Sequence, residues 1–144
     1  MAVKPVHLEI MTPSKLFYKG DVEMVIVTTL DGDEGFMAGH VWGCKLLKVG
    51  ELWVKEVGAA KNEWRIAAVA GGFIDCQDSI VIYTDAVEWA EDIDMKRVLS
   101  EKATAEDWIA KHEKDADPEE VEAAKRAIAK ADARASVAGG GKKR

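Results

Sequence analysis

The histidine and cysteine side chains are the residues of this chain best suited to nucleophilic or metal chemistry. They are His7, His40, His112, Cys44 and Cys76. Zinc ligands occur at short, characteristic spacings, and these five residues are scattered instead. A nucleophile elbow and a glycine-rich phosphate loop are both missing. The acidic turn at 31–34 lacks the terminal bidentate glutamate of a calcium loop. The sequence therefore predicts no catalytic residue and no metal site. The alternative of a small hydrolase that uses His40 with Cys44 is supported by no catalytic motif in the sequence.

The lysine and arginine residues near the C-terminus form a second chemically capable group. The net charge of the 144 residues is −6, and residues 85–122 are strongly acidic. The last 22 residues instead carry Lys125, Arg126, Lys130, Arg134, Lys142, Lys143 and Arg144 against the single Asp132. A basic end on an acidic protein indicates an acidic partner surface. A basic groove interleaved with aromatic residues is absent, so nucleic acid is not an expected partner.

Short strands are expected to fill the first part of the chain, residues 1–88. Two strong strands are expected at Trp64–Ala70 and Ser79–Thr84, with a shorter one, Gly72–Asp75, between them. These runs are rich in Ile, Val and Tyr and are bounded by Gly-Gly and Gln-Asp-Ser. A hairpin is expected across Val49-Gly50, between strands at 44–48 and 51–57. The regular spacing of nine or ten strands predicts a ten-stranded β-sandwich, with a flattened barrel as the other possibility.

Residues 89–138 change to a helical period and predict an antiparallel two-helix hairpin. Asp92 or Asp94 can cap a first helix that runs through Lys111. Asp117 followed by Pro118, with Glu120 in the capping-box position, predicts the start of a second helix. That helix should end at Gly139, leaving 139–144 as a flexible basic tail. Its buried stripe is mostly alanine, which buries little area, so the hairpin is expected to dock and undock.

The chain shows neither a signal peptide nor an apolar run that could cross a membrane. We therefore expect a cytoplasmic protein, or one peripheral to a membrane. Two cysteines far apart in a chain without an export signal are expected to be buried, reduced thiols.

Several stretches together resemble the ε subunit of F-type ATP synthases, which is called δ in mitochondria. They are LEIMTPSKLFYKGDVEMVIVTTLDGDEGFMAGH near the N-terminus, WRIAAVAGGFIDCQDSIVIYTDAVEWAEDID in the middle and KADARASVA near the C-terminus. The resemblance covers nearly the whole chain. It implies a non-catalytic rotor subunit of the central stalk, on the cytoplasmic face of the bacterial inner membrane. The expected partners are the γ subunit and the ring of c subunits, so the membrane is met only through the complex.

The resemblance also implies where the contacts lie. Asp31, Asp33, His40 and Trp42 fall in loops expected to face the c-ring and γ. The helices are expected to extend along γ and inhibit ATP hydrolysis, with Lys125, Arg126, Lys130 and Arg134 contacting acidic segments of the α and β catalytic subunits.

Some bacterial members of this family bind a regulatory ATP between the sandwich and the helices. The residues at the corresponding positions here are Glu88, Ile93, Asp94, Arg97, Lys130 and Arg134. Two positions depart from the family pattern, since Val98 stands in place of alanine and Lys130 in place of arginine. No cofactor is otherwise required. The alternative to a rotor subunit is a free-standing β-sandwich adaptor with a helical tail. The sequence leaves open whether the host enzyme couples to protons or sodium, and whether the helices rest docked or extended.

Overall fold

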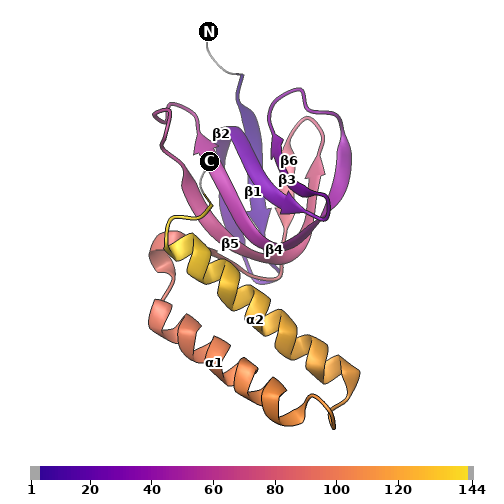
Figure 1. The fold of residues 1–144 in the computed structure, drawn as a ribbon. Coiled ribbons are helices and arrows are strands. Elements are labelled where there is room, and N and C mark those ends of the chain that lie inside the picture. Colours follow the sequence, from indigo (N-terminus) through magenta and orange to yellow (C-terminus); the bar gives the residue numbers. More distant parts are fainter. Residues whose placement is uncertain (1–3, 143–144) are drawn as a thin grey trace.

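The computed structural model describes residues 4–142, which form a β-domain followed by two helices (Figure 1). The strands are β1 (Val6–Met11), β2 (Leu16–Thr29), β3 (Gly32–Phe36), β4 (Gly43–Glu56), β5 (Arg65–Cys76), β6 (Ile80–Tyr83) and β7 (Val87–Trp89). A short 3₁₀ turn, η1 (Ala90–Asp92), leads to α1 (Met95–His112) and α2 (Pro118–Ala138). The predicted order of a β-domain and a helical hairpin is confirmed.

The strands close on themselves as a flattened barrel. The order β1-β6-β5-β4-β2-β3 runs across the sheet, and β1 also pairs with β2 to complete the ring. Every pairing is antiparallel except the parallel pair of β1 and β6. A closed sheet leaves few edge strands to pair with other chains.

The predicted strand number of ten is wrong, because residues 4–142 form seven strands. The expected hairpin at Val49-Gly50 does not form, since β4 continues through both residues while paired with β5. The Gly71-Gly72 pair likewise does not separate two strands: it bends β5, which pairs with β7 before the bend and with β6 after it. Glycines at a barrel corner can bend a strand without ending it. The sequence pattern alone does not distinguish such a bend from a break between two strands.

The Gly72 backbone could not accept a side chain. Its φ angle is +113°, in the region that favours glycine. A Cβ atom there would also clash with the carbonyl oxygen of Tyr83. The bend therefore depends on glycine for both conformation and space.

The core of the domain lies between the two curved faces of the barrel. Its fully buried members include Leu8, Ile10, Val25, Phe36, Leu52, Ile74, Ile80 and Ile82. All buried residues of this core cluster fall between Val6 and Trp89. The β-domain thus has a core that does not depend on the helices.

The two helices pack against each other in antiparallel directions, and α2 lies against β4 and β5 (Figure 1). Lys102 of α1 pairs with Asp132 of α2 at 2.7 Å. Val121, Ala131 and Val137 are the buried residues of α2, whereas α1 buries only Val98. The hairpin is therefore held on the β-domain mainly by α2.

Of the two predicted helix N-caps, only one makes capping hydrogen bonds through its side chain. Asp94 caps α1, since its side chain accepts hydrogen bonds from the backbone nitrogens of Lys96 and Arg97. Asp117 stands at the N-cap of α2, but its side chain makes no capping hydrogen bond. The expected capping box with Glu120 is thus wrong, although the helix begins at the predicted proline.

Both cysteines are free thiols, as predicted. Cys76 is buried, but Cys44 is exposed, so the prediction of two buried thiols is wrong for Cys44. It lies near the start of β4, outside the core.

Candidate functional site

A cleft of about 380 Å³ separates the β-domain from the helices. Its floor is formed by small residues of β5 and its neighbours, including Ala68, Ala70 and Ala86. Its walls carry the charged side chains Glu88, Arg97, Glu101, Lys130 and Arg134. Four of the six residues predicted to bind ATP therefore line one cleft. This volume falls within the range of known small-molecule sites.

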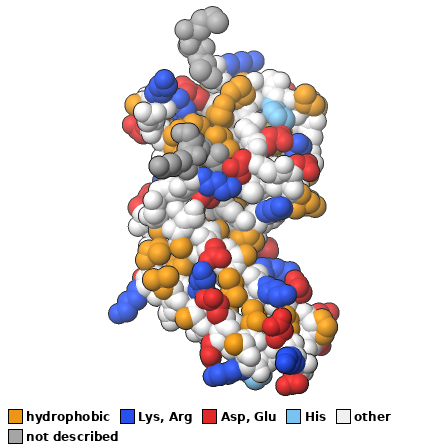
Figure 2. All heavy atoms as spheres, viewed as in Figure 1, with side chains coloured by type: hydrophobic (Ala, Val, Ile, Leu, Met, Phe, Trp, Pro, Cys, Tyr) orange, Lys and Arg blue, Asp and Glu red, His pale blue; other side chains and the backbone are white. Residues whose placement is uncertain are grey.

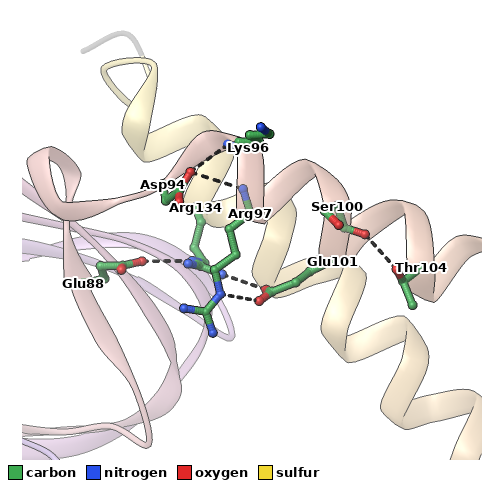
Figure 3. A network of polar contacts seen from close by, with 8 residues as sticks. All are labelled: Glu88, Asp94, Lys96, Arg97, Ser100, Glu101, Thr104 and Arg134. Carbon is green, nitrogen blue, oxygen red and sulfur yellow. Dashed lines mark hydrogen bonds and ion pairs between the residues drawn. The ribbon is translucent and has the colours of Figure 1, made fainter.

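All charged residues of the cleft except Lys130 form a continuous chain of ion pairs (Figure 3). Arg134 of α2 donates from Nε to Glu88 at 3.0 Å and from Nη1 to Glu101 at 3.0 Å. The other oxygen of Glu101 accepts a hydrogen bond from Arg97 Nε at 2.9 Å. The Glu101 carboxylate thus bridges the two arginines of the cleft, and Arg97 and Arg134 hold the pKa of that carboxyl below its ordinary value.

Lys130 differs from the arginines of the cleft. Among residues 4–142 no carboxylate lies within ion-pair distance of its ammonium group. The charged wall of the cleft therefore has three cations and two carboxylates, and the unpaired charge is positive. Such an excess favours an anionic ligand.

The structure does not bring the remaining two predicted ATP residues into the cleft. Ile93 is half-buried before α1, and Asp94 uses its carboxylate to cap that helix. Neither side chain lines the cleft. Asp94 instead fixes the start of α1, and thereby the position of Arg97 one turn later.

The basic residues of α2 separate into two groups. Lys125 and Arg126 are exposed, whereas Lys130 and Arg134 are half-buried at the cleft. Acidic and basic side chains are interspersed over the helical part of the molecule (Figure 2). Because α1 lies antiparallel to α2, its acidic residues neutralise part of the basic charge of α2 within the chain.

The residues predicted to contact the c-ring and γ lie on the turn before β3, on β3 and in the loop that follows it. Asp31 is in the β2–β3 turn, and Asp33 accepts a hydrogen bond from Thr28 at 2.8 Å. The His40 ring packs on Phe36 with 4.5 Å between centroids. Trp42 is 63% exposed. The structure therefore places these four residues in neighbouring elements, but it does not bring them together with the cleft.

An exposed apolar surface accompanies the β3–β4 loop. Val41 and Trp42 are 81% and 63% exposed, and Leu46 is 60% exposed. The loop lies at the end of the β-domain away from the helices (Figure 1). Glu34 fixes its base through an ion pair with Lys45 and a 3.4 Å contact with His40. Exposed apolar side chains that lie near one another are typical of an interaction surface.

The family model of the ATP synthase delta/epsilon chain, β-sandwich domain, matches residues 5–90. The chain belongs to this family. It is 43% identical over 101 residues to the ATP synthase epsilon chain of Caldicellulosiruptor saccharolyticus, covering 69% of this chain and 71% of that one. It is 37% identical over 138 residues to the epsilon chain of Bacillus velezensis, covering 95% of this chain and 99% of that one.

Solved structures share the fold of this delta/epsilon chain. A chain of the Euglena gracilis mitochondrial ATP synthase, in a structure of OSCP, F1 and the c-ring, aligns with a TM-score of 0.74 and 19% identity. That alignment covers 89% of this chain and 78% of the other. A chain of the central stalk and c-ring of the Tetrahymena thermophila enzyme aligns with a TM-score of 0.60 and 14% identity, covering 96% and 99%.

Two glutamates of this delta/epsilon chain carry structural roles that sequence reasoning missed. Glu101 stands four residues after Arg97, a spacing that places both on one helix face and was available as a signal. Glu51 lies in β4 and is 2% exposed. An acidic residue in a strand pattern normally indicates a solvent-facing position, so the sequence held no signal for its burial.

Within residues 4–142, no helix has both the length and the apolar character needed to cross a membrane. In the same range, no three His, Cys, Asp or Glu side chains gather closely enough to hold a metal ion.

Proposed function

We propose that this chain is a non-catalytic rotor subunit in the central stalk of an F-type ATP synthase, where it couples the γ subunit to the c-ring. The observation that carries the proposal is the alignment with the Bacillus velezensis epsilon chain, which spans 95% of this chain and 99% of that relative. An alignment of that extent includes both helices as well as the β-domain. The subunit would lie on the cytoplasmic face of a bacterial inner membrane, attached through the complex.

The surface proposed to meet γ and the c-ring is the β3 region with its following loop. Asp31, Asp33, His40 and Trp42 lie there, and the exposed Val41 and Trp42 supply apolar area. An aromatic anchor surrounded by charged residues is a common composition of a protein interface. Glu34 links this loop to β4 through its contacts with His40 and Lys45.

The helices are proposed to regulate ATP hydrolysis by leaving the β-domain and extending along γ. In the docked arrangement, Lys125 and Arg126 are exposed, while Arg134 is held by Glu88 and Glu101. Extension would release Arg134 and Lys130 to join Lys125 and Arg126 as one basic face toward the α and β subunits. The independent core of the β-domain supports this separation, because detaching the helices removes no residue from that core.

The test is ATP hydrolysis by the assembled host complex, with the full chain and with a chain that ends at Glu91. We expect faster hydrolysis with the truncated chain and retained coupling, since the truncation keeps every core residue of the β-domain. A full chain with K125A and R126A should show part of the same acceleration. Equal hydrolysis rates in all three complexes would reject the inhibitory role, and failure of the full chain to join the complex would reject the rotor assignment.

Regulatory ATP binding in the cleft is a second proposed function, and one observation favours it. The fold brings Glu88, Arg97, Lys130 and Arg134 to one cleft from positions far apart in the sequence. Arginine and lysine are the natural binders of phosphate groups, and Arg97 and Arg134 can offer paired donors. The cleft residues therefore fit a nucleotide, with the condition that its phosphates compete with Glu101 for both arginines.

Binding of ATP to the isolated full chain can be measured by calorimetry. We expect K130A and R97A to weaken binding, because each removes a cation from the cleft. The matched control is R126A, which removes an exposed cation of the same helix outside the cleft. Equal affinities of K130A, R97A and R126A would reject the cleft as the site.

A further inference from the structure

The C-terminal end of the described chain lies against a buried carboxylate of the β-domain. Glu51 in β4 is 2% exposed, although ionised carboxylates are rarely buried without partners. It has three donors: Trp53 Nε1 at 2.8 Å, Ser136 Oγ at 2.6 Å and the backbone nitrogen of Lys142 at 3.0 Å. Trp53 belongs to the same strand. The other two donors come from the end of α2 and the segment after it.

The segment after α2 turns back toward Glu51 through its glycines. The backbone nitrogens of Gly140 and Gly141 donate to the carbonyl oxygens of Val137 and Ser136. Gly140 and Gly141 both have positive φ angles, of +104° and +75°. These two residues therefore reverse the chain so that Lys142 reaches β4.

Gly141 also packs where no side chain would fit. A Cβ atom at this position would lie 2.7 Å from Cζ2 of Trp53 and 3.1 Å from Oε1 of Glu51. A Cβ atom at Gly140 would meet nothing within 4 Å. Trp53 is itself 7% exposed, so its ring has little freedom to move away. Gly141 is thus closely fitted to the surface of β4.

Two further contacts extend this surface. Lys142 Nζ lies 3.4 Å from Asp33 on β3, which adds an exposed ion pair. Val137 is fully buried at the last turn of α2. Apolar, polar and charged contacts therefore meet at one end of the helix, on the same face of the sheet as the cleft floor but through residues that do not line the cleft.

We propose that the Glu51–Trp53 face of the β-domain is a binding site for the chain's own segment 136–142, which acts as a latch that holds both helices docked. Gly139–Lys142 therefore do not form the flexible tail that the sequence predicted, since this segment folds back onto β4. Lys143 and Arg144, the rest of that predicted tail, lie outside the described residues. Because α2 is the helix that packs on β4 and β5, and α1 packs mainly on α2, freeing the end of α2 frees the hairpin. The latch does not depend on nucleotide binding or on the host complex.

The test is amide hydrogen exchange of the isolated full chain. S136A removes one of the two hydrogen bonds that join Glu51 to the C-terminal segment. Hydrogen bonds to charged groups are the strong ones, so we expect α2 amides to exchange about tenfold faster or more. Most of the stability of a helix in a protein comes from its packing, so an undocked α2 should exchange its amides faster than a docked one. Strand amides of β5 should keep their protection.

The matched control is S100A on α1, whose hydroxyl makes no side-chain contact with the β-domain among the described residues.

The glycines supply a second, steric pair of variants. G141A and G140A both place alanine at a positive φ angle, so both carry backbone strain. Only G141A also meets the Trp53 ring, so its α2 amides should exchange faster than those of G140A. Equal exchange in G141A and G140A, together with unchanged exchange in S136A, would overturn the latch. S136A decides by itself if either glycine variant folds poorly, since Ser136 is exposed on a helix and lies outside the core.

Discussion

Glu101 of α1 accepts a hydrogen bond from Arg134 of α2 at 3.0 Å, across the seam between the two helices. Its second oxygen accepts from Arg97 at 2.9 Å. The carboxylate therefore occupies the position between two guanidinium groups in which a phosphate would make similar contacts. This arrangement gives the docked helices an anion of their own, so docking does not require a nucleotide to neutralise the two arginines.

E101Q should strengthen ATP binding to the isolated chain. Removing the carboxylate charge releases Arg97 from its ion pair, leaves Arg134 with Glu88 alone and raises the positive charge of the cleft. An exposed ion pair is worth up to about 1 kcal/mol, so the affinity should rise about fivefold. Calorimetric titration of wild type and variant with ATP measures the change.

The matched control for this prediction is E106Q, which removes an exposed carboxylate of the same helix that lies outside the cleft. It should leave the affinity near that of the wild type. Weaker or unchanged ATP binding by E101Q would contradict the competition between Glu101 and phosphate.

D94A should destabilise α1 more than D117A destabilises α2. Asp94 accepts hydrogen bonds from two backbone nitrogens at 3.1 and 3.3 Å, whereas the side chain of Asp117 makes none. Loss of a working N-cap costs about 0.5–2 kcal/mol. Urea unfolding followed by circular dichroism should show this loss for D94A and a clearly smaller one for D117A. Equal losses would show that the difference in capping has no energetic consequence.

The sequence predicted the order of the elements well and their boundaries less well. Strand propensity, turn residues and helical periodicity separated the β-domain from the hairpin near Trp89, because these signals are local. The continuity of β4 through Val49-Gly50 depends on pairing with β5, which a local pattern does not contain. The cleft likewise combines residues that the sequence could identify with a contact that only the packing of the helices creates. The family resemblance identified Arg97 and Arg134, but the bridge through Glu101 arises only when α1 and α2 pack together.

The two thiols should differ sharply in reactivity toward a disulfide reagent. Cys44 is exposed. Cys76 is buried, and burial together with the neighbouring Asp75 raises the pKa of its thiol. Since the thiolate is the reactive form, the native protein should titrate one thiol quickly and the second only when denatured. C44A should abolish the fast phase, whereas C76A should retain it. A fast phase in C44A would show that the β-domain opens readily around Cys76.

Docking of the helices should weaken at acidic pH because of Glu51. Burial acts to raise the pKa of this carboxyl, but hydrogen bonds from Ser136, Lys142 and Trp53 outweigh burial and hold the pKa below its ordinary value of 4.5. A lowered pKa in the docked state means that the contribution of Glu51 is fully present above the ordinary value. That contribution is lost as the pH falls through the docked-state value.

Amide exchange protection of α2, corrected for the intrinsic rate at each pH, measures the effect. E51Q separates Glu51 from the other carboxylates: the protection lost in E51Q relative to wild type should be large at pH 7 and should shrink below pH 4.5. A difference that stays constant across this range would show that the ionised form of Glu51 does not hold the latch.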